Sequence, residues 1–379
     1  LKTVLEDIDH YWFGGFRTLF ESSNFQETKV IDFRREVYKI MNQLISETEY
    51  SEIDDTLIEL LSLQDPTVQE NKTLSFKLAK DIIMHMLYCI QSKVPSFKIP
   101  ISSEIDDKVE KIVELLERRS TILKESETSH IVLIPTNQCN SIPWESTPIL
   151  RDKSVTRMPS IQMLTNLLSN NNNSPEGKQI DTSKGYYVIN PAGDLKRTEE
   201  NFKTIFEDMH GWNGIVGDKP TETDIIQGIS NSNLYIYAGH GGGEQYIKSK
   251  SIKKLENCCP TILLGCSSGA LKYEGVFEPY GTVYNYLLGG SPMVLANLWD
   301  VTDKDIDKFT ISMFQKWELF VDYDSLKSFS LSTCNDDSTD DNELPLNLSE
   351  AIRDSRDTCT LKYLNGAAPI LYGIPMTLK

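Results

Sequence analysis

Residues 234–243, "LYIYAGHGGG", place His240, one of only five histidines in the chain, directly after an apolar run of strand type. Three consecutive glycines follow this histidine. Glycine lets the backbone turn sharply and approach a ligand closely. The stretch is therefore compatible with a phosphate-binding loop, with a plain turn, or with one half of a catalytic pair.

A second apolar run, "TILLGC" (261–266), ends in Cys266 and is the counterpart of the first. Functional groups gather at the carboxyl ends of strands in open parallel sheets. One crossover fits between the two runs, so we expect His240 and Cys266 at the same edge of adjacent strands. A neighbouring histidine is the usual activator of a cysteine nucleophile. The phosphate-loop alternative is weak, because no lysine stands where a P-loop requires one.

The residues beside this pair have expected supporting roles. The backbone N–H groups of Gly241 and Cys266 are suited to bind the oxyanion of a tetrahedral intermediate. Gly265 allows a sharp turn before the cysteine. Ser267 and Ser268 follow it and are expected to shape the floor of the pocket.

Similar apolar runs surround the pair and set the expected fold. They are "HIVLIP" (130–135), "YYVINP" (186–191) and "PMVLANLW" (292–299), with helical patterns such as "TEENFKTIFEDM" (198–209) between them. Strands that alternate with helices predict a mostly parallel sheet flanked by helices. We therefore expect an α/β catalytic domain over residues 128–379. Within it, the acidic stretch 334–345 is predicted to be a mobile loop, a solvated insertion in the first place.

Residues 1–127 are expected to form an α-helical segment that supports the catalytic domain or binds substrate. "VIDFRREVYKIMNQLIS" (30–46) and "DIIMHMLYCIQS" (81–92) carry apolar residues at helical spacing. His10 and His85 stand among apolar neighbours and are predicted to be packing residues.

Composition narrows the classes of function. The 379 residues carry a formal net charge of −17, which argues against direct nucleic-acid binding and is compatible with a basic partner or substrate. The seven cysteines show no disulfide framework and no zinc-site spacing, which favours a reducing compartment and no metal. Cys258 and Cys259 precede their strand and are interpreted as packing or surface thiols. No apolar run approaches the ~20 residues of a membrane span. We expect no cofactor. A chain that begins with Leu1 is interpreted as a fragment.

The acidic stretch "WDVTDKDIDKF" (299–309) follows the last apolar run and begins at the same edge of the sheet. One or two carboxylates there can bind a cationic group. The sequence leaves three candidates open, namely Asp300, Asp303 and Asp307. The last two stand one helical turn apart on one face.

The beginning of that helix also has purely structural interpretations. Thr302 is expected to be its N-cap, with Asp305 completing a capping box and complementing the helix dipole. Trp299 and Tyr273 are expected to be walls of the pocket for this cationic group, and a core position suits Trp299 equally well.

Several longer stretches point to one family. They are "YAGHGGGEQY" (237–246), "LLGCSSGAL" (263–271), "FEPYGTVYNYLLGGSPMVLANLWDVTDKDID" (277–307), "LKYLNGAAPILYGIP" (361–375), "IPWESTPIL" (142–150), "VINPAGDLKRTEENF" (188–202), "GIVGDKPTE" (214–222) and the opening "DHYWFGGFRTLF" (9–20). Together they resemble the protease domain of the separases, which are caspase-like cysteine peptidases of clan CD. The resemblance is strong over residues 128–379.

This resemblance implies a function. Cys266 would be the nucleophile and His240 the general base and acid of an endopeptidase that cuts the kleisin subunit of cohesin after arginine and releases sister chromatids at anaphase. The group bound by the acidic stretch would then be the arginine guanidinium, with Asp300, Asp303 and Asp307 as the candidates that hold it. The substrate would usually carry an acidic residue a few positions upstream. Securin, bound as a pseudosubstrate, would be the inhibitory partner. Nucleus and cytoplasm, including the spindle, would be the place of action.

Two alternatives remain beside this interpretation. The chain could be another caspase-like peptidase with a different substrate, or a catalytically silent scaffold on the same fold. The sequence shows no obvious third member of a catalytic triad. Glu244 is close to His240 along the chain, which is weak evidence by itself.

Overall fold

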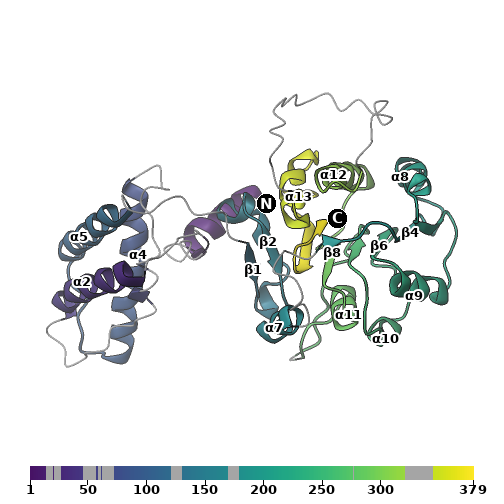
Figure 1. Cartoon of the computed structure of the whole chain (residues 1–379). Helices are drawn as coiled ribbons and strands as arrows, with labels where there is room; N and C mark the ends of the chain where they lie inside the picture. Colours follow the sequence, from purple (N-terminus) through teal and green to yellow (C-terminus); the bar gives the residue numbers. More distant parts are fainter. Residues whose placement is uncertain are drawn as a thin grey trace. The chain divides into compact units, whose positions relative to one another are not determined.

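The computed structural model describes residues 1–13, 20, 27–45, 57–58, 61, 72–120, 130–169, 179–275, 277–320 and 345–379. The chain forms two compact units (Figure 1). One comprises Lys2–Ser129 with Thr147–Ile149, and the other comprises Leu1, His130–Ser146 and Leu150–Lys379. The acidic stretch 334–345 lies outside the described residues, except for its last position.

The first unit is helical where it is described. It contains α1 (Lys2–Asp7), the π-helix η1 (Ile8–Phe13), α2 (Glu27–Ile45), α4 (Lys72–Lys93) and α5 (Ser102–Ser120). Helix α5 packs against both α2 and α4. Their shared core includes Val37, Ile82 and Ile112, all without solvent exposure. Within each helix the buried residues recur at helical spacing, because each helix buries one apolar face.

One prediction for this unit is wrong. His85 is exposed rather than packed, and its Nε2 atom lies 3.6 Å from Sγ of Cys89. The physical reason is the orientation of α4 about its axis. The face with Ile82 and Met86 is buried, and His85 lies on the opposite, exposed face. The side chain of His10 lies outside the described residues.

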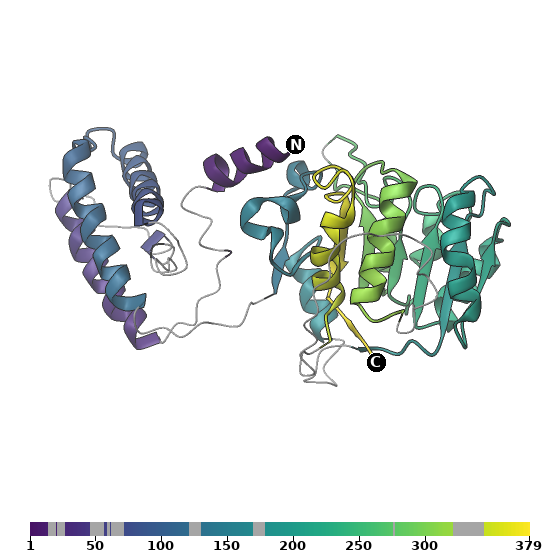
Figure 2. The same cartoon turned by 90° about the horizontal axis from the view of Figure 1, so that it is seen from above.

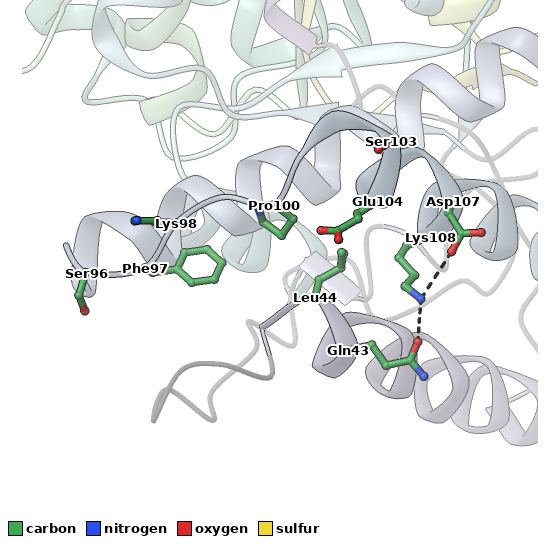
Figure 3. Close-up of a pocket in the computed structure, with 10 residues that line it drawn as sticks. All are labelled: Gln43, Leu44, Ser96, Phe97, Lys98, Pro100, Ser103, Glu104, Asp107 and Lys108. Atoms are coloured by element: carbon green, nitrogen blue, oxygen red, sulfur yellow. Dashed lines mark hydrogen bonds and ion pairs between the residues drawn. The ribbon is translucent and has the colours of Figure 1, made fainter.

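The helical unit contains a cavity of about 760 Å³ (Figure 3). Its lining is mostly polar, and Lys108 Nζ donates to Gln43 Oε1 at 2.9 Å and lies 3.5 Å from Asp107 Oδ2. No cysteine or histidine is among the described residues that line it, so this cavity is not where the expected chemistry occurs.

The second unit is built on an eight-stranded sheet. Its strands are β1 (Ile131–Leu133), β2 (Val155–Arg157), β4 (Gly185–Ile189), β5 (Asn213–Val216), β6 (Leu234–Ala238), β7 (Thr261–Leu263), β8 (Met293–Asn297) and β9 (Pro369–Gly373). Their spatial order is β1-β2-β9-β8-β7-β6-β4-β5. All neighbours are parallel except β8 and β9, which are antiparallel. A second sheet pairs β3 (Gln179–Ile180) with β10 (Thr377–Leu378).

Helices cover both faces of the large sheet (Figure 1). One face carries α8 (Lys196–Asp208), α12 (Asp303–Lys316) and α13 (Leu348–Ser355), which lie side by side when seen from above (Figure 2). The other face carries α7 (Ile161–Ser169), α9 (Glu222–Asn231), α10 (Ser249–Ile252) and α11 (Thr282–Leu288). The remaining short elements are η3 (Asn137–Cys139), η4 (Trp144–Ser146), α6 (Pro148–Arg151) and η6 (Arg356–Thr358). The expected mostly parallel α/β sheet is confirmed.

The central strands β6, β7, β8 and β9 are buried along their whole length, which explains why they occur as continuous apolar runs. One core cluster, with Phe206, Phe309 and Trp317, lies under α8 and α12. The other, with Tyr235 and Tyr286, lies under α9 and α11. The strands are thereby held between two apolar layers.

A buried ion pair fixes the chain that follows β1. Arg157, at the end of β2, donates from Nε to Glu145 Oε1 at 2.6 Å and from NH2 to Glu145 Oε2 at 2.7 Å. The same guanidinium donates to the carbonyl oxygens of Asn140 and Ile142. Arg157 is fully buried and Glu145 is 3% exposed. Burial alone would lower the pKa of Arg157, but the Glu145 charge raises it.

Candidate active site

His240 and Cys266 come from adjacent strands. Tyr237 of β6 pairs in register with Leu263 of β7, and the two strands are parallel. Each strand ends before its functional residue, so both residues stand beyond the carboxyl ends. They line a common pocket. The sequence placed both residues at this edge, and this is where they lie.

Gly265 allows the two loops to meet. A Cβ atom at this position would lie 2.0 Å from the carbonyl oxygen of Gly241 and 2.3 Å from that of Gly239. Real Cβ atoms do not approach backbone that closely, so any other residue would push the cysteine loop away from the histidine loop. The glycine before Cys266 is therefore a requirement of packing between the loops.

The three glycines after His240 have separate reasons. Gly241 and Gly243 have φ angles of +63° and +82°, a region that L-residues with side chains rarely adopt. A Cβ on Gly242 would lie 2.8 Å from Cγ2 of Thr282. Two of the glycines therefore serve the turn, and the middle one serves close packing against α11.

The histidine loop is fixed through its backbone. The carbonyl oxygen of His240 accepts hydrogen bonds from the Tyr237 hydroxyl at 2.9 Å and from Gln245 Nε2 at 3.2 Å. Glu244 Oε2 accepts from the Gly242 N–H at 2.9 Å, and Oε1 accepts from the Thr282 hydroxyl. The Glu244 carboxylate thus closes the turn.

The imidazole of His240 contacts a different carboxylate. Its Nε2 lies 2.9 Å from Asp194 Oδ2. About half of each side chain is exposed, 52% for His240 and 59% for Asp194. The hydrogen bond to His240 lowers the pKa of Asp194. The pattern analysis did not single out Asp194, although it lies in the stretch "VINPAGD" that leaves β4, the neighbour of β6.

The loop that carries Asp194 is held by Asn190. Asn190 has a φ of +48°, unusual for a residue other than glycine. Its Oδ1 accepts from the Leu195 N–H and its Nδ2 donates to Glu199 Oε2, both at 2.8 Å. Its backbone N–H donates to the Ala238 carbonyl of β6 at 2.8 Å. The turn from β4 into α8 is therefore tied at both ends.

The turn after Cys266 is tied to the end of β8. Ser267 has a φ of +53°, and its N–H donates to the Trp299 carbonyl at 3.1 Å. Asn297 Nδ2 donates to the carbonyls of Leu264 at 3.0 Å and Gly265 at 3.2 Å. The thiol of Cys266 donates to the Val301 carbonyl at 3.2 Å, so the sulfur lies next to the residues that precede α12.

The two N–H groups expected to bind an oxyanion are available for that role. Within the part of the chain that the structure describes, neither the Gly241 N–H nor the Cys266 N–H has a hydrogen-bond acceptor. Both belong to residues that flank or form the common pocket. An acyl oxygen placed beside the sulfur would supply the missing acceptor.

Asp303 and Asp307 are the acidic residues of the pocket. Asp307 is 3% exposed and accepts from Thr198 Oγ1 at 3.1 Å and Asn201 Nδ2 at 2.8 Å. Burial raises the pKa of Asp307 to about 6 despite these hydrogen bonds. Asp303, in the first turn of α12, is exposed. Among the described residues it has no hydrogen-bond or ion-pair partner.

The other expected pocket residues lie elsewhere. Asp300 accepts from the Ser267 hydroxyl at 2.6 Å, and the Trp299 Nε1–H donates to the Leu364 carbonyl at 3.1 Å. Ser268 is buried and donates to the Leu263 carbonyl. Tyr273 is 47% exposed on the segment after the cysteine loop. None of these side chains is among the described residues that line the pocket.

The expected capping box at the start of α12 is wrong. The helix begins at Asp303 with Thr302 as N-cap, but no side-chain cap bond forms. Asp305 instead accepts from the backbone N–H groups of Thr360 and Leu361, each at 3.0 Å, and from Asn365 Nδ2 at 2.9 Å. Burial alone would raise the pKa of Asp305, but these hydrogen bonds lower it to about 2. Three donors at once are a better partner for a buried carboxylate than one cap.

The chain is similar to known proteins in sequence and in fold. The family model for "Separin, protease domain" matches residues 1–306. The separin of Saccharomyces cerevisiae is 35% identical over 389 residues, which cover 99% of this chain and 22% of that protein. The separin of Schizosaccharomyces pombe is 34% identical over 380 residues, covering 99% of this chain and 20% of that protein.

This chain belongs to the separase family. A crystal structure of the Saccharomyces cerevisiae separase–securin complex superimposes with a TM-score of 0.80 at 35% identity, covering 100% of this chain and 25% of that one. The family and the caspase-like fold expected from the sequence are thereby confirmed, and the chain carries a protease domain. It spans a quarter or less of the length of these relatives.

Within this separase-family domain, Cys266 is the cysteine that lines the pocket. Cys89 and Cys139 are also half-buried, but neither is among the described residues that line it. Cys258 and Cys359 are buried, and burial raises the pKa of each thiol to about 12. Cys259 is also buried, with its pKa raised for the same reason. Cys266 is half-buried and lies in the pocket beside His240. A buried thiol in apolar surroundings is inert, so the pocket cysteine is the suitable nucleophile.

Neither a metal-binding group nor a membrane-spanning helix occurs in the described part of this separase-family chain. Its His, Cys, Asp and Glu side chains form no group of three or more that could hold a metal ion. None of its helices is both long and apolar enough to cross a membrane.

Proposed function

We propose that this chain is a cysteine endopeptidase domain that cleaves the kleisin subunit of cohesin after arginine and so releases sister chromatids at anaphase. The observation that carries the proposal is one pocket lined by His240, Cys266, Asp303 and Asp307. A nucleophile with its base and a site for a cationic side chain are thus adjacent. Membership of the separase family supports the choice of substrate.

Cys266 attacks the carbonyl carbon of the arginine residue, and its thiol proton moves to His240. The negative charge that develops on the carbonyl oxygen is bound by the N–H groups of Gly241 and Cys266. His240 then protonates the leaving amine and, in the second half-reaction, activates the water that hydrolyses the thioester. The steps need the side chains of Cys266 and His240, the two backbone N–H groups and one water molecule.

Asp303 is the residue we propose to bind the arginine guanidinium. Its carboxylate is exposed at the pocket and unpaired among the described residues, whereas Asp307 is engaged with Thr198 and Asn201. Asp307 lies deeper and adds negative potential beneath the guanidinium. Asp300 is bound to Ser267 and is the least suited of the three.

We propose a securin-like protein as the inhibitory partner, bound in this pocket as a pseudosubstrate. The similar yeast structure is of a separase–securin complex, which supports this partner. A pseudosubstrate needs a side chain that fills the acidic pocket without a cleavable bond in register with Cys266.

The test uses two acyloxymethyl ketone probes, one carrying arginine and one carrying aspartate, on the 379-residue chain. We expect covalent labelling by the arginine probe alone and cleavage of a kleisin-type peptide after arginine. Cys266→Ser should abolish both, whereas Cys139→Ser, which changes another half-buried cysteine, should leave both intact.

Three results would contradict the proposal. Labelling by the aspartate probe would favour a caspase-like peptidase of different specificity. Absence of any labelling, in a chain shown to be folded by circular dichroism, would favour a catalytically silent scaffold. Cleavage retained in Cys266→Ser would exclude Cys266 as the nucleophile.

A further inference from the structure

Three strand ends, not two, meet at the pocket. Strand β4 lies beside β6 on the side away from β7, and its following loop carries Asp194. Asp194, His240 and Cys266 therefore follow three consecutive strands of the sheet. The carboxylate reaches the imidazole although 46 residues separate Asp194 from His240 along the chain.

We infer that Asp194 is a positioning residue for His240, and that the Asn190–Glu199 contact holds Asp194 in place. This inference rests on the proposed peptidase activity. A carboxylate accepts hydrogen bonds and does not donate them at neutral pH, so the Nε2 atom of His240 carries the proton in this contact. The neutral imidazole then leaves its Nδ1 lone pair free for the Cys266 proton.

The proton balance follows from that tautomer. The Cys266 S–H proton moves to His240 Nδ1, which forms the thiolate and an imidazolium. Asp194 stays ionised and accepts from Nε2–H throughout, as the orienting carboxylate of other nucleophile–histidine systems does. The imidazolium gives the Nδ1 proton to the leaving amine nitrogen, and the neutral tautomer is restored.

Asn190 fixes the loop by a conformation that most residues avoid. Its φ of +48° lets its side chain turn back and accept from Leu195 N–H, which directly follows Asp194. Its amide nitrogen donates to Glu199 in the first turn of α8. Asn is one of the few residues other than glycine that tolerates this backbone region and can form both bonds.

The first experiment compares Asp194→Asn and Asp194→Ala with the unaltered chain. We expect kcat on an arginine peptide to fall on the order of tenfold to a hundredfold, with KM changed less than about twofold, because the carboxylate orients the base and does not touch the arginine. A nitrogen-15 spectrum of the histidines, with His240 assigned from His240→Gln, should show the Nε2-protonated tautomer, and Asp194→Ala should lose this preference.

The second experiment exchanges the hydrogen-bond donor and acceptor in the contact between Asn190 and Glu199. Asn190→Asp removes the donation to Glu199 and should lower kcat. Adding Glu199→Gln supplies a donor from the other side, so the double variant Asn190→Asp/Glu199→Gln should regain kcat and the His240 tautomer. Glu200→Gln, one position along and outside this contact, serves as the matched control and should not restore kcat.

The outcomes separate this inference from the proposed function. Loss of arginine-probe labelling in the unaltered chain would remove the peptidase proposal, while the histidine spectrum would still test the tautomer. Unchanged kcat and an unchanged spectrum in both Asp194 variants would overturn the inference, even where labelling of Cys266 persists. A drop in kcat without a change of tautomer in Asp194→Ala would likewise overturn it.

Discussion

Gly265 packs directly against the backbone of Gly241, with no room for a side chain between them. A Cβ on Gly265 would fall 2.0 Å from the Gly241 carbonyl oxygen, and the same loop presents His240. The distance between the loops that carry His240 and Cys266 is therefore set by contact between their backbones. An added side chain at Gly265 would move Cys266 away from His240.

Gly265→Ala should therefore reduce kcat on an arginine peptide by on the order of a hundredfold or more. We also expect a loss of about 1–3 kcal/mol in the free energy of unfolding, typical of overpacking. Urea denaturation and steady-state kinetics measure the two effects. Gly275→Ala is the control for activity alone, because nothing lies within 4 Å of its added methyl group, and activity should stay within about twofold. Its φ of +60° is unfavourable for alanine, so its stability is not compared. Equal activity of both variants would contradict the packing argument.

Asp303→Asn should raise KM for arginine peptides by on the order of tenfold to a hundredfold. The expected loss corresponds to one charge-assisted hydrogen bond, about 1.5–3 kcal/mol. The parallel variant Asp300→Asn should change KM little, because Asp300 is bound to Ser267 outside the pocket lining. A larger effect for Asp300→Asn than for Asp303→Asn would show that Asp300, and not Asp303, binds the arginine.

Asp307 should make arginine binding depend on pH. Its pKa is raised by burial to about 6, so the carboxyl is increasingly protonated below that pH. The ionised form attracts a guanidinium, and KM should therefore fall as pH rises from 5 to 7. In Asp307→Asn this change should disappear. Inhibition by an arginine ketone and by its neutral citrulline analogue, measured across the same range, distinguishes charge from general pH effects.

Asp305→Asn should destabilise the domain by about 1–3 kcal/mol at pH 7. The variant removes the charge that accepts from Thr360 N–H, Leu361 N–H and Asn365. The folded-state pKa of about 2 lies below the usual 3.8, so this stabilisation is present above pH 3.8 and lost as pH falls through 2. Thermal unfolding from pH 7 to pH 2 measures it. Asp303→Asn, exposed in the same helical turn, should show no comparable loss.

Arg157→Met should cost about 3–5 kcal/mol of stability, because Glu145 is left as a buried charge without its partner. Removing both charges in Arg157→Met/Glu145→Leu should recover a large part of that loss. Chemical denaturation of four proteins, namely the unaltered chain, Arg157→Met, Glu145→Leu and the double variant, gives the coupling free energy. If the double variant were less stable than Arg157→Met, the buried charge of Glu145 would not be the cause.

The sequence predicted that His240 and Cys266 lie at one edge of the sheet, because both signals are local. Each residue follows an apolar run long enough to identify a buried parallel strand, and such strands meet a common edge at their carboxyl ends. Asp194 lacked this signal, because it stands five positions beyond β4 and contacts His240 only through the order β4-β6-β7. Strand order is a property of the whole sheet, so pairwise patterns along the chain did not reveal it.

The acidic residues of α12 show a second limit. Spacing correctly indicated that Asp303 and Asp307 share one helix face and one pocket. It could not show that Asp307 would be covered by Thr198 and Asn201 from α8, nor that Asp305 would bind the segment 360–365. These contacts join residues far apart in the chain, and local propensity carries no information about them. The edge strand β5, "NGIV", was also not predicted, since its residues are exposed or half-buried and form no apolar run.

Strand β9 lies between β2 and β8, although it is the last strand of the large sheet to be synthesised. Among the described strands, β1–β2 and the block from β8 to β5 are joined in the sheet through β9, residues 369–373. The sheet therefore stays open between β2 and β8 until these residues have been made, which is after His240 and Cys266. A nascent chain therefore contains His240 and Cys266 before the sheet that positions them is closed, and the segment through Gly373 has to be made before the eight strands can pair.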